Sequence, residues 1–298
     1  MTFSKRLPLI YKFYIYQGKR FPIIFLILSI FPVILSSAVI VMQGKPNLLQ
    51  LLLAFVASLS YFFHIRVIDD YRDFQHDNLY HKDRPVQAGI ISLADLKKID
   101  FIMVAIFLLI SIFSNLYSFG LALFLLLYTY FAKNDFFAGE KIRKYFYSYN
   151  TINFVQMIIL QMYIYAFFSK GFYFNSLINT HFLFIITGTL IFEFLRKVKT
   201  PESEGAGKDT YSWHMGFGRS IMVYLLFVFL NAFLFFKIAA SISSRLEMLL
   251  LVSLSFIMIT SLFAYLNWIK RNDTTTQLLQ LISLISYGSF NIIIYLLK

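Results

Sequence analysis

Cysteine is absent from this chain of 298 residues, and charged residues make up only 14% of it. The absence of thiols excludes disulfide bonds, cysteine-based zinc sites and catalysis by a thiolate. The scarcity of charge, together with 59% hydrophobic residues and a mean hydropathy of +0.69, excludes an ordinary soluble domain. The sequence therefore predicts an all-α polytopic membrane protein, and its length suits a single membrane domain over 1–298.

Several motifs of well-known enzyme classes are missing as well. The chain has no Gly-rich phosphate-binding loop and no signature of the CDP-alcohol phosphotransferases, and its five histidines lack the spacings of metalloproteases and deaminases. Each histidine is therefore expected to be a packing or loop residue. A net charge of +12 would suggest nucleic acid as a partner of a soluble protein. Here the basic residues lie in short loops between apolar runs, so no nucleic-acid partner is expected.

Long apolar runs are abundant. Runs close to the length that crosses a bilayer number about nine; they lie at 21–43, 48–65, 99–117, 119–132, 150–168, 178–195, 220–237, 246–267 and 276–297. Only Ser118, Phe119 and Gly120 separate the third run from the fourth, and we expect the chain to turn there. Pro32 is expected to kink the first run.

Basic residues are divided unequally between the two sides of the membrane that these runs define. The side of the amino terminus carries 22 of the 27 Lys and Arg residues. By the positive-inside rule, the amino terminus and the loops at 66–98, 133–149 and 196–219 are predicted to face the cytoplasm. The sequence thus predicts an integral protein of the cytoplasmic membrane.

The leader, residues 1–20, is expected to lie on the inner membrane surface. Leu9, Phe13 and Tyr16 recur at helical spacing beside basic residues, which is typical of an interfacial amphipathic helix. A disordered basic tail is the alternative.

Four aspartates follow the second apolar run directly, at the rim of the membrane. On one helix they would share one stripe, where their mutual repulsion requires a cation. Mg²⁺ suits such a place, because it binds a few carboxylates together with water and phosphate oxygens. The pattern therefore predicts a magnesium site for a diphosphate. The alternative is a solvated acidic loop neutralised by nearby basic residues. The aspartates are Asp69, Asp70, Asp73 and Asp77, and the basic residues are Arg66, Arg72, Lys82 and Arg84.

The segment DDYRDFQHD, followed by DRPVQAG, resembles the first signature of the UbiA superfamily of intramembrane prenyltransferases, Asn-Asp-x-x-Asp-x-x-x-Asp followed by Arg-Pro and a Gly. Asp69 stands where the family has Asn. The resemblance implies that all four aspartates are metal ligands and that three of them are catalytic. The positions that match the signature are Asp70, Asp73, Asp77, Arg84, Pro85 and Gly89, and the catalytic three are Asp70, Asp73 and Asp77.

The second acidic motif of that family corresponds here to FEFLRKVKTPESEGAGKDTYSWHMGFG. Gly207, Thr210 and Gly216 align with the family pattern, but Lys199 and Ser203 occupy its usual Asp positions. Under the resemblance, either Glu202 and Glu204 replace the missing metal ligands, or the chain belongs to a divergent branch with altered metal binding. An ordinary polar loop is the third interpretation.

The resemblance also implies a set of cations around the diphosphate. Lys133 follows an aromatic-rich helix end, where the family often has a basic residue. The resemblance implies a catalytic role for this lysine as well. Arg binds phosphate by forked hydrogen bonds and Lys as a point charge. Each of these cations alone could instead be a membrane anchor. The set is Arg84, Lys133, Arg196 and Lys197.

Together these features imply Mg²⁺-dependent transfer of a prenyl group from a prenyl diphosphate to an aromatic or other small lipophilic acceptor within the membrane. The implied fold is a helical bundle with two pseudo-repeated four-helix halves and a ninth helix, surrounded by membrane lipids. A cation-coupled carrier is one alternative, and a non-catalytic family member that binds a polyprenyl lipid is another. A carrier should have polar or broken helices at mid-membrane. Here the acids lie at the ends of the apolar runs, which favours chemistry.

Overall fold

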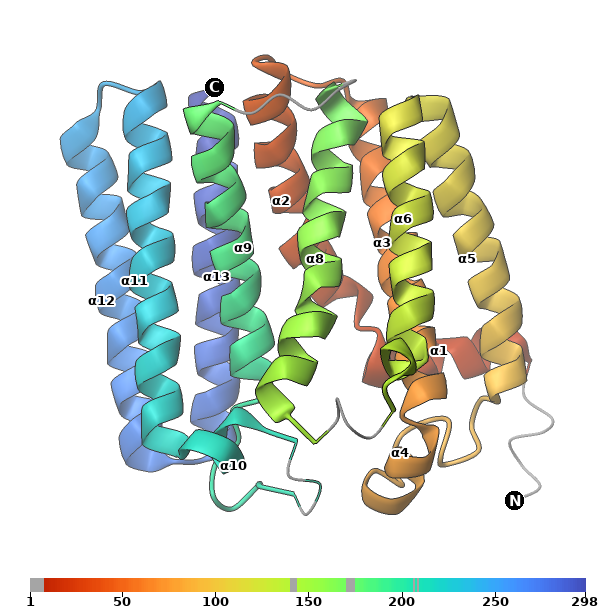
Figure 1. Ribbon diagram of the computed structural model, residues 1–298. Helices are drawn as coiled ribbons and strands as arrows, with labels where there is room; N and C mark the ends of the chain where they lie inside the picture. Colours follow the sequence, from red (N-terminus) through yellow and green to blue (C-terminus); the bar gives the residue numbers. More distant parts are fainter. Residues whose placement is uncertain (1–7, 140–143, 170–174, 206, 208) are drawn as a thin grey trace. The chain divides into compact units, whose positions relative to one another are not determined.

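The computed structural model describes residues 8–139, 144–169, 175–205, 207 and 209–298, and the regular structure in these ranges is helical throughout (Figure 1). The helices are α1 (Leu9–Arg20), α2 (Ile23–Met42), α3 (Leu48–Arg72), α4 (Phe74–Tyr80), α5 (Leu93–Ser114), α6 (Leu116–Lys133), the short 3-10 turn η2 (Asp135–Phe137), α8 (Phe146–Ser169), α9 (Ser176–Arg196), α10 (Tyr211–Met215), α11 (Phe217–Ile242), α12 (Leu246–Lys270) and α13 (Asp273–Leu297). The all-helical prediction is confirmed.

Eight of the helices in the described ranges are long and apolar enough to cross a membrane. They are α2, α3, α6, α8, α9, α11, α12 and α13. The remaining predicted span, at 99–117, corresponds to α5, which is 22 residues long but carries Asp95, Lys97, Lys98 and Asp100 in its first turns. Its charged end explains why a count by composition gives eight spans, whereas a count of long helices agrees with the predicted nine.

The turn between α5 and α6 lies a few residues before the predicted one. Asn115 has extended backbone, and its side chain accepts a hydrogen bond of 2.9 Å from the amide of Ser118. This side-chain cap satisfies an amide that has no partner within the helix and so begins α6 at Leu116. Gly120, which we expected in the turn, lies inside α6.

The chain divides into two compact units, Met1–Phe31 with Asn47–Gly171 and Pro32–Pro46 with Phe172–Lys298. In the first unit, α3 packs on α5 and α6, and α6 packs on α8. In the second unit, α11 packs on α9 and α12, and α13 packs on α12 and α9. Each unit thus holds four long helices, as the predicted halves require, and α2 is divided between them at Pro32. The single domain over 1–298 stays a prediction.

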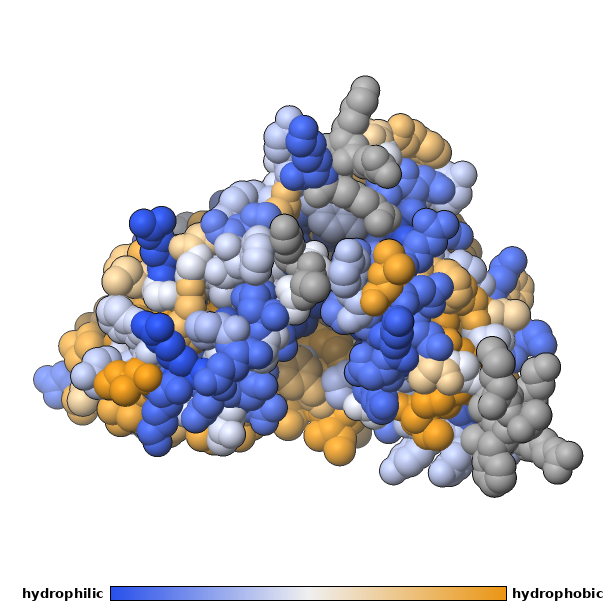
Figure 2. All heavy atoms as spheres, turned by 90° about the horizontal axis from the view of Figure 1, so that it is seen from below, coloured by the Kyte–Doolittle hydropathy of each residue, from blue (hydrophilic) through white to orange (hydrophobic). Residues whose placement is uncertain are grey.

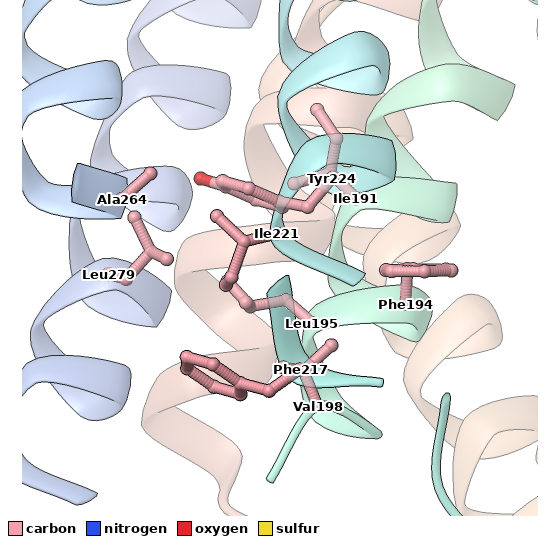
Figure 3. Packing of buried hydrophobic residues seen from close by; sticks show 9 residues of the cluster. All are labelled: Ile191, Phe194, Leu195, Val198, Phe217, Ile221, Tyr224, Ala264 and Leu279. Carbon is pink, nitrogen blue, oxygen red and sulfur yellow. The ribbon is translucent and has the colours of Figure 1, made fainter. Parts of the chain in front are cut away.

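A hydrophobic cluster closes the second unit near the start of α11 (Figure 3). Leu195 of α9 and Val198, which follows this helix, pack with Phe217 and Ile221 of α11, all at most 8% exposed. Tyr224 is fully buried, and its hydroxyl shares a 2.6 Å hydrogen bond with Ser283 of α13. The first residues of the loop that follows α9 are therefore held in place by this packed cluster.

Gly188 marks a close approach of α9 to α13, because a Cβ atom at this position would lie 2.0 Å from the ring of Tyr287. Small residues allow membrane helices to pack this closely. We expect Gly188→Ala to destabilise the second unit by about 1–3 kcal/mol, because the rigid ring must shift within a packed core. Thermal unfolding in detergent would measure the loss. Gly120→Ala is the matched control, since nothing lies within 4 Å of that position, and equal unfolding temperatures for both variants would contradict the prediction.

Candidate functional site

The first acidic motif spans the junction of α3 and α4. Asp73 joins the two helices, and its amide donates to the carbonyl of Asp69 at 2.9 Å, while the amide of Asp77 donates to the carbonyl of Asp73 at 2.8 Å. The backbone therefore keeps a helical course through the motif. Burial divides the aspartates into two pairs: Asp70 and Asp77 are 2% and 1% exposed, whereas the side chains of Asp69 and Asp73 are 22% and 29% exposed.

Asp70 is held by α1. The hydroxyl of Tyr16 donates to Oδ2 of Asp70 at 2.7 Å, and Arg20 donates to Oδ1 through Nε at 3.1 Å and through Nη2. Tyr16 is fully buried, and this burial, reinforced by the neighbouring Asp70 carboxylate, raises the pKa of Tyr16, so that its hydroxyl stays a donor. Both oxygens of Asp70 thus face the leader helix.

The sequence indicated α1 only as an interfacial helix and missed these two roles. Its helical state from Leu9 to Arg20 is confirmed, which removes the disordered alternative for that part. Tyr16 and Arg20 are 54 and 50 residues from Asp70. No local pattern connects positions so far apart. The one available signal was a Tyr and an Arg spaced one helical turn apart on a segment that precedes the motif.

Asp69 and Asp73 share the guanidinium of Arg72. Its Nη2 donates to Asp69 at 2.8 Å and to Asp73 at 3.2 Å, and its Nε donates to Asp73 at 3.2 Å. Arg72 also donates to the amide oxygen of Asn153 on α8 at 3.1 Å and lies over the ring of Tyr149, 5.5 Å from the centroid. A single positive group therefore already bridges the two more exposed carboxylates.

Asp77 pairs with Arg84 through Nη1. The DRPVQAG segment fixes this arginine in a tight turn, in which the amide of Arg84 donates to the carbonyl of His81 at 3.1 Å and the amide of Ala88 donates to the carbonyl of Arg84 at 2.8 Å. Gly89 ends the turn with φ +69°, a conformation that favours glycine. The Arg-Pro and Gly of the signature thus act together to place Arg84 beside Asp77.

Lys133 lies at the end of α6, and its Nζ is 5.1 Å from the ring centroid of Tyr71 on α3. Tyr71 is itself fixed by a 2.9 Å hydrogen bond from its hydroxyl to the carbonyl of Leu93. The structure therefore places the predicted lysine against the helix that carries the acidic motif. Its proposed role toward a diphosphate stays a prediction.

The oxygen donors of the motif fit Mg²⁺, a hard cation that prefers carboxylates. Asp69 and Asp73 in particular are close enough to share one cation, as Arg72 shows. The alternative of an acidic loop neutralised by arginines also describes part of the arrangement, because Arg66, Arg72 and Arg84 all pair with these acids. Within the described ranges, each carboxylate of the motif has at least one basic partner.

In the second unit, the two predicted phosphate-binding cations pair with a residue of α9. Arg196 lies 2.8 Å and Lys197 lies 3.0 Å from the carboxylate of Glu193. The side chain of Arg196 is 58% exposed and that of Lys197 is 21% exposed. An ion pair with so exposed an arginine contributes little stability.

The second acidic loop follows directly. Glu202 is exposed, and Glu204 accepts a hydrogen bond from the hydroxyl of Thr210, which also caps α10. Ser203, which stands at one usual Asp position of the family, donates to Oδ1 of Asp273 at 2.6 Å. Asp273, at the start of α13, thus places a carboxylate beside Ser203, at a position where the family usually has an Asp. The sequence missed it because it lies 70 residues downstream.

The ends of these helices are polar. Figure 2 looks onto the helix ends from below and shows many hydrophilic side chains over them, with apolar side chains between and around these. Acids and bases of both loops therefore lie at helix ends and not along the apolar flanks, where they would face lipid.

Among curated proteins there is no match to the chain. Solved structures do resemble it. One is a UbiA homologue from Aeropyrum pernix K1, with a TM-score of 0.58, 14% identity and coverage of 90% of this chain and 96% of the other. A UbiA homologue from Archaeoglobus fulgidus bound to DMAPP and Mg²⁺ has a TM-score of 0.54, 14% identity and coverage of 94% and 98%.

A third structure, of a digeranylgeranylglyceryl phosphate synthase, has a TM-score of 0.55, 19% identity and coverage of 95% of this chain and 99% of the other. At such identities, the likeness shows the fold. The family comparison reaches further, because the sequence model of the UbiA prenyltransferase family matches residues 29–285. That range includes both acidic loops and most of the chain, so the protein belongs to the UbiA prenyltransferase family.

Proposed function

We propose that this protein transfers a prenyl group from a prenyl diphosphate to a lipophilic acceptor within the membrane, with Mg²⁺ as cofactor. The observation that carries the proposal is the pair Asp69 and Asp73, two partly exposed carboxylates that already share one cationic group. Family membership supports the reaction class, and the related structure with DMAPP and Mg²⁺ supports the substrate class and the metal.

The carboxylates are proposed to have different roles according to their burial. Asp69 and Asp73 would hold Mg²⁺, assisted by Asp70 and Asp77, while Glu202 and Glu204 would hold a second ion in the other loop. When bound, Mg²⁺ neutralises the diphosphate and makes it a better leaving group. In the first unit, Arg84 and Lys133 would bind diphosphate oxygens directly, and in the second unit Arg196 and Lys197 are proposed for the same role. Aromatic side chains along the helices would face the allylic cation, since their ring faces attract positive charge.

Both acidic loops are expected on the cytoplasmic side. If the nine long helices cross in turn, the ends of α3, α6, α9 and α12 share one side of the membrane, and their loops carry most of the basic residues. This orientation would give both loops access to a water-soluble diphosphate head, while the prenyl tail lies among the helices.

The absence of cysteine makes this topology simple to test. We expect Gln75→Cys and Lys199→Cys to react with an impermeant maleimide only from the cytoplasmic side, and Ser244→Cys, in the short connection between α11 and α12, only from the other side. The three positions are exposed helix-end or loop residues. Labelling of Gln75→Cys from outside in intact cells or oriented vesicles would contradict the charge-based orientation.

Purified protein in nanodiscs, given prenyl diphosphates of several lengths and Mg²⁺, tests the activity itself. Release of pyrophosphate that depends on both Mg²⁺ and an acceptor is the expected result. Mass spectrometry of lipids and quinones from cells with and without the protein would then identify the acceptor.

A non-catalytic, prenyl-lipid-binding role is the second candidate. Two observations favour it: Ser203 and Lys199 stand at the usual Asp positions of the second motif, and Glu204 is already bonded to Thr210. Under this role, the protein would bind a prenyl diphosphate but release no pyrophosphate with any acceptor. A carrier function is less well supported, because the acids of the first motif lie at the end of α3 and in α4.

A further inference from the structure

Two imidazoles and a carboxylate meet at α4. His76 and Asp77 lie on this helix, and His81 follows it as the capping residue. One ligand atom from each of the three side chains can be chosen so that all three atoms lie within 4.8 Å of one another. No sequence pattern predicts this group, because the histidines are five residues apart and follow no common metal-binding spacing.

The end of α4 brings the three side chains together. The amide of His81 donates to the carbonyl of Asp77 at 2.9 Å, and its backbone then leaves the helix at φ −134° and ψ 52°. The His81 ring turns back toward His76, with ring centroids 5.7 Å apart. The His76 ring also lies beside the ring of Tyr80, with the centroids 4.8 Å apart.

Asp77 is the fixed member of the group. It is 1% exposed, and Arg84 binds its Oδ2. Its Oδ1 lies 3.7 Å from the Nδ1 of His76, so this oxygen and this nitrogen are close enough to bind one ion. A metal-ligating carboxylate is commonly hydrogen-bonded through its remaining oxygen, and Arg84 would supply that bond.

We propose that His76, Asp77 and His81 bind a divalent first-row transition-metal cation, such as Zn²⁺ or Co²⁺. Mg²⁺ does not suit this group, because it prefers oxygen ligands, whereas imidazole suits softer cations. Two His and one carboxylate also leave coordination positions open for water or an oxygen of another ligand. This site shares Asp77 with the Mg²⁺ ligands of the proposed function, but it does not include Asp69 or Asp73.

Purified protein without a polyhistidine tag, in detergent, tests the proposal. Titration with Co²⁺, followed by its visible absorption, should show one ion bound per chain through nitrogen and oxygen ligands, and a large excess of Mg²⁺ should not displace it. His76→Gln and His81→Gln should each weaken Co²⁺ binding at least about tenfold, since each removes a direct ligand.

His214→Gln is the matched control, because this histidine is exposed on α10 of the second unit. Thermal unfolding of each variant verifies that it folds. Asp73→Asn separates this proposal from the previous one, since it should remove pyrophosphate release and leave Co²⁺ binding intact. Absence of Co²⁺ binding, or binding that both His76→Gln and His81→Gln leave unchanged, would overturn the site. Loss of Co²⁺ binding in Asp77→Asn, but in neither histidine variant, would assign the ion to the acidic motif and would also overturn the proposed site.

Discussion

Asp73→Asn should reduce pyrophosphate release from a prenyl diphosphate by at least about 100-fold, because a metal ion contributes several kcal/mol to such a reaction and each 1.4 kcal/mol is about tenfold. Asp73 is the most exposed carboxylate of the first motif, at 29%, and it shares a cation with Asp69. The variant keeps the shape of the side chain and removes its charge. The measurement is pyrophosphate release in nanodiscs over a range of Mg²⁺ concentrations.

Asp83→Asn provides the control, since it removes an exposed acid from the loop that follows α4. We expect this variant to keep full activity and the same Mg²⁺ dependence. If Asp73→Asn also kept full activity with a confirmed substrate, the role proposed for the first motif would be wrong. If a higher Mg²⁺ concentration restored the activity that Asp73→Asn loses, Asp73 would be one of several ligands whose contributions overlap.

Much of the fold could be predicted from the sequence, because apolar runs of membrane length have few alternatives to a helix. The family prediction is confirmed. The helix boundaries that were predicted wrongly are those that single side chains determine. Asn115 begins α6 by capping it, and nothing in the apolar run distinguished it from Ser118 or Gly120. The charged first turns of α5 likewise hide a long helix from a count by composition.

The candidate site could be predicted only where its residues are neighbours in the sequence. Asp69, Asp73 and Asp77 follow the helical repeat, and Arg84 follows in the same signature. Partners that lie far away in the sequence could not be predicted in this way. Asp273 depends on the packing of α13 near the loop after α9, and two chain segments must fold before it meets Ser203.

The contact between α1 and Asp70 is another one that the sequence does not predict. Arg20→Ala should destabilise the first unit by about 3–5 kcal/mol, the usual cost of leaving a buried charge without its partner. The side chains of Arg20 and Asp70 are only 13% and 3% exposed, so water replaces the lost partner poorly. Thermal unfolding in detergent measures the total loss, and proteolysis near Arg20 would show whether α1 detaches first.

A double variant, Arg20→Met with Asp70→Asn, separates the two contributions. It removes both charges and keeps most of the buried volume, so it should recover most of the stability that Arg20→Ala loses. Tyr16→Phe should cost less, about 1.5–3 kcal/mol, because it removes one hydrogen bond to a charged group and leaves the ion pair intact.

Activity then decides what the buried contact is for. If α1 serves to fix Asp70 for the diphosphate site, the double variant should be stable and still release pyrophosphate poorly. Recovery of both stability and turnover would mean that Asp70 and Arg20 only fasten α1 to α3, and that Asp69 and Asp73 suffice for the metal. A stability of Arg20→Ala equal to that of the unmodified protein would show that solvent reaches Asp70 freely, contrary to its burial in the structure.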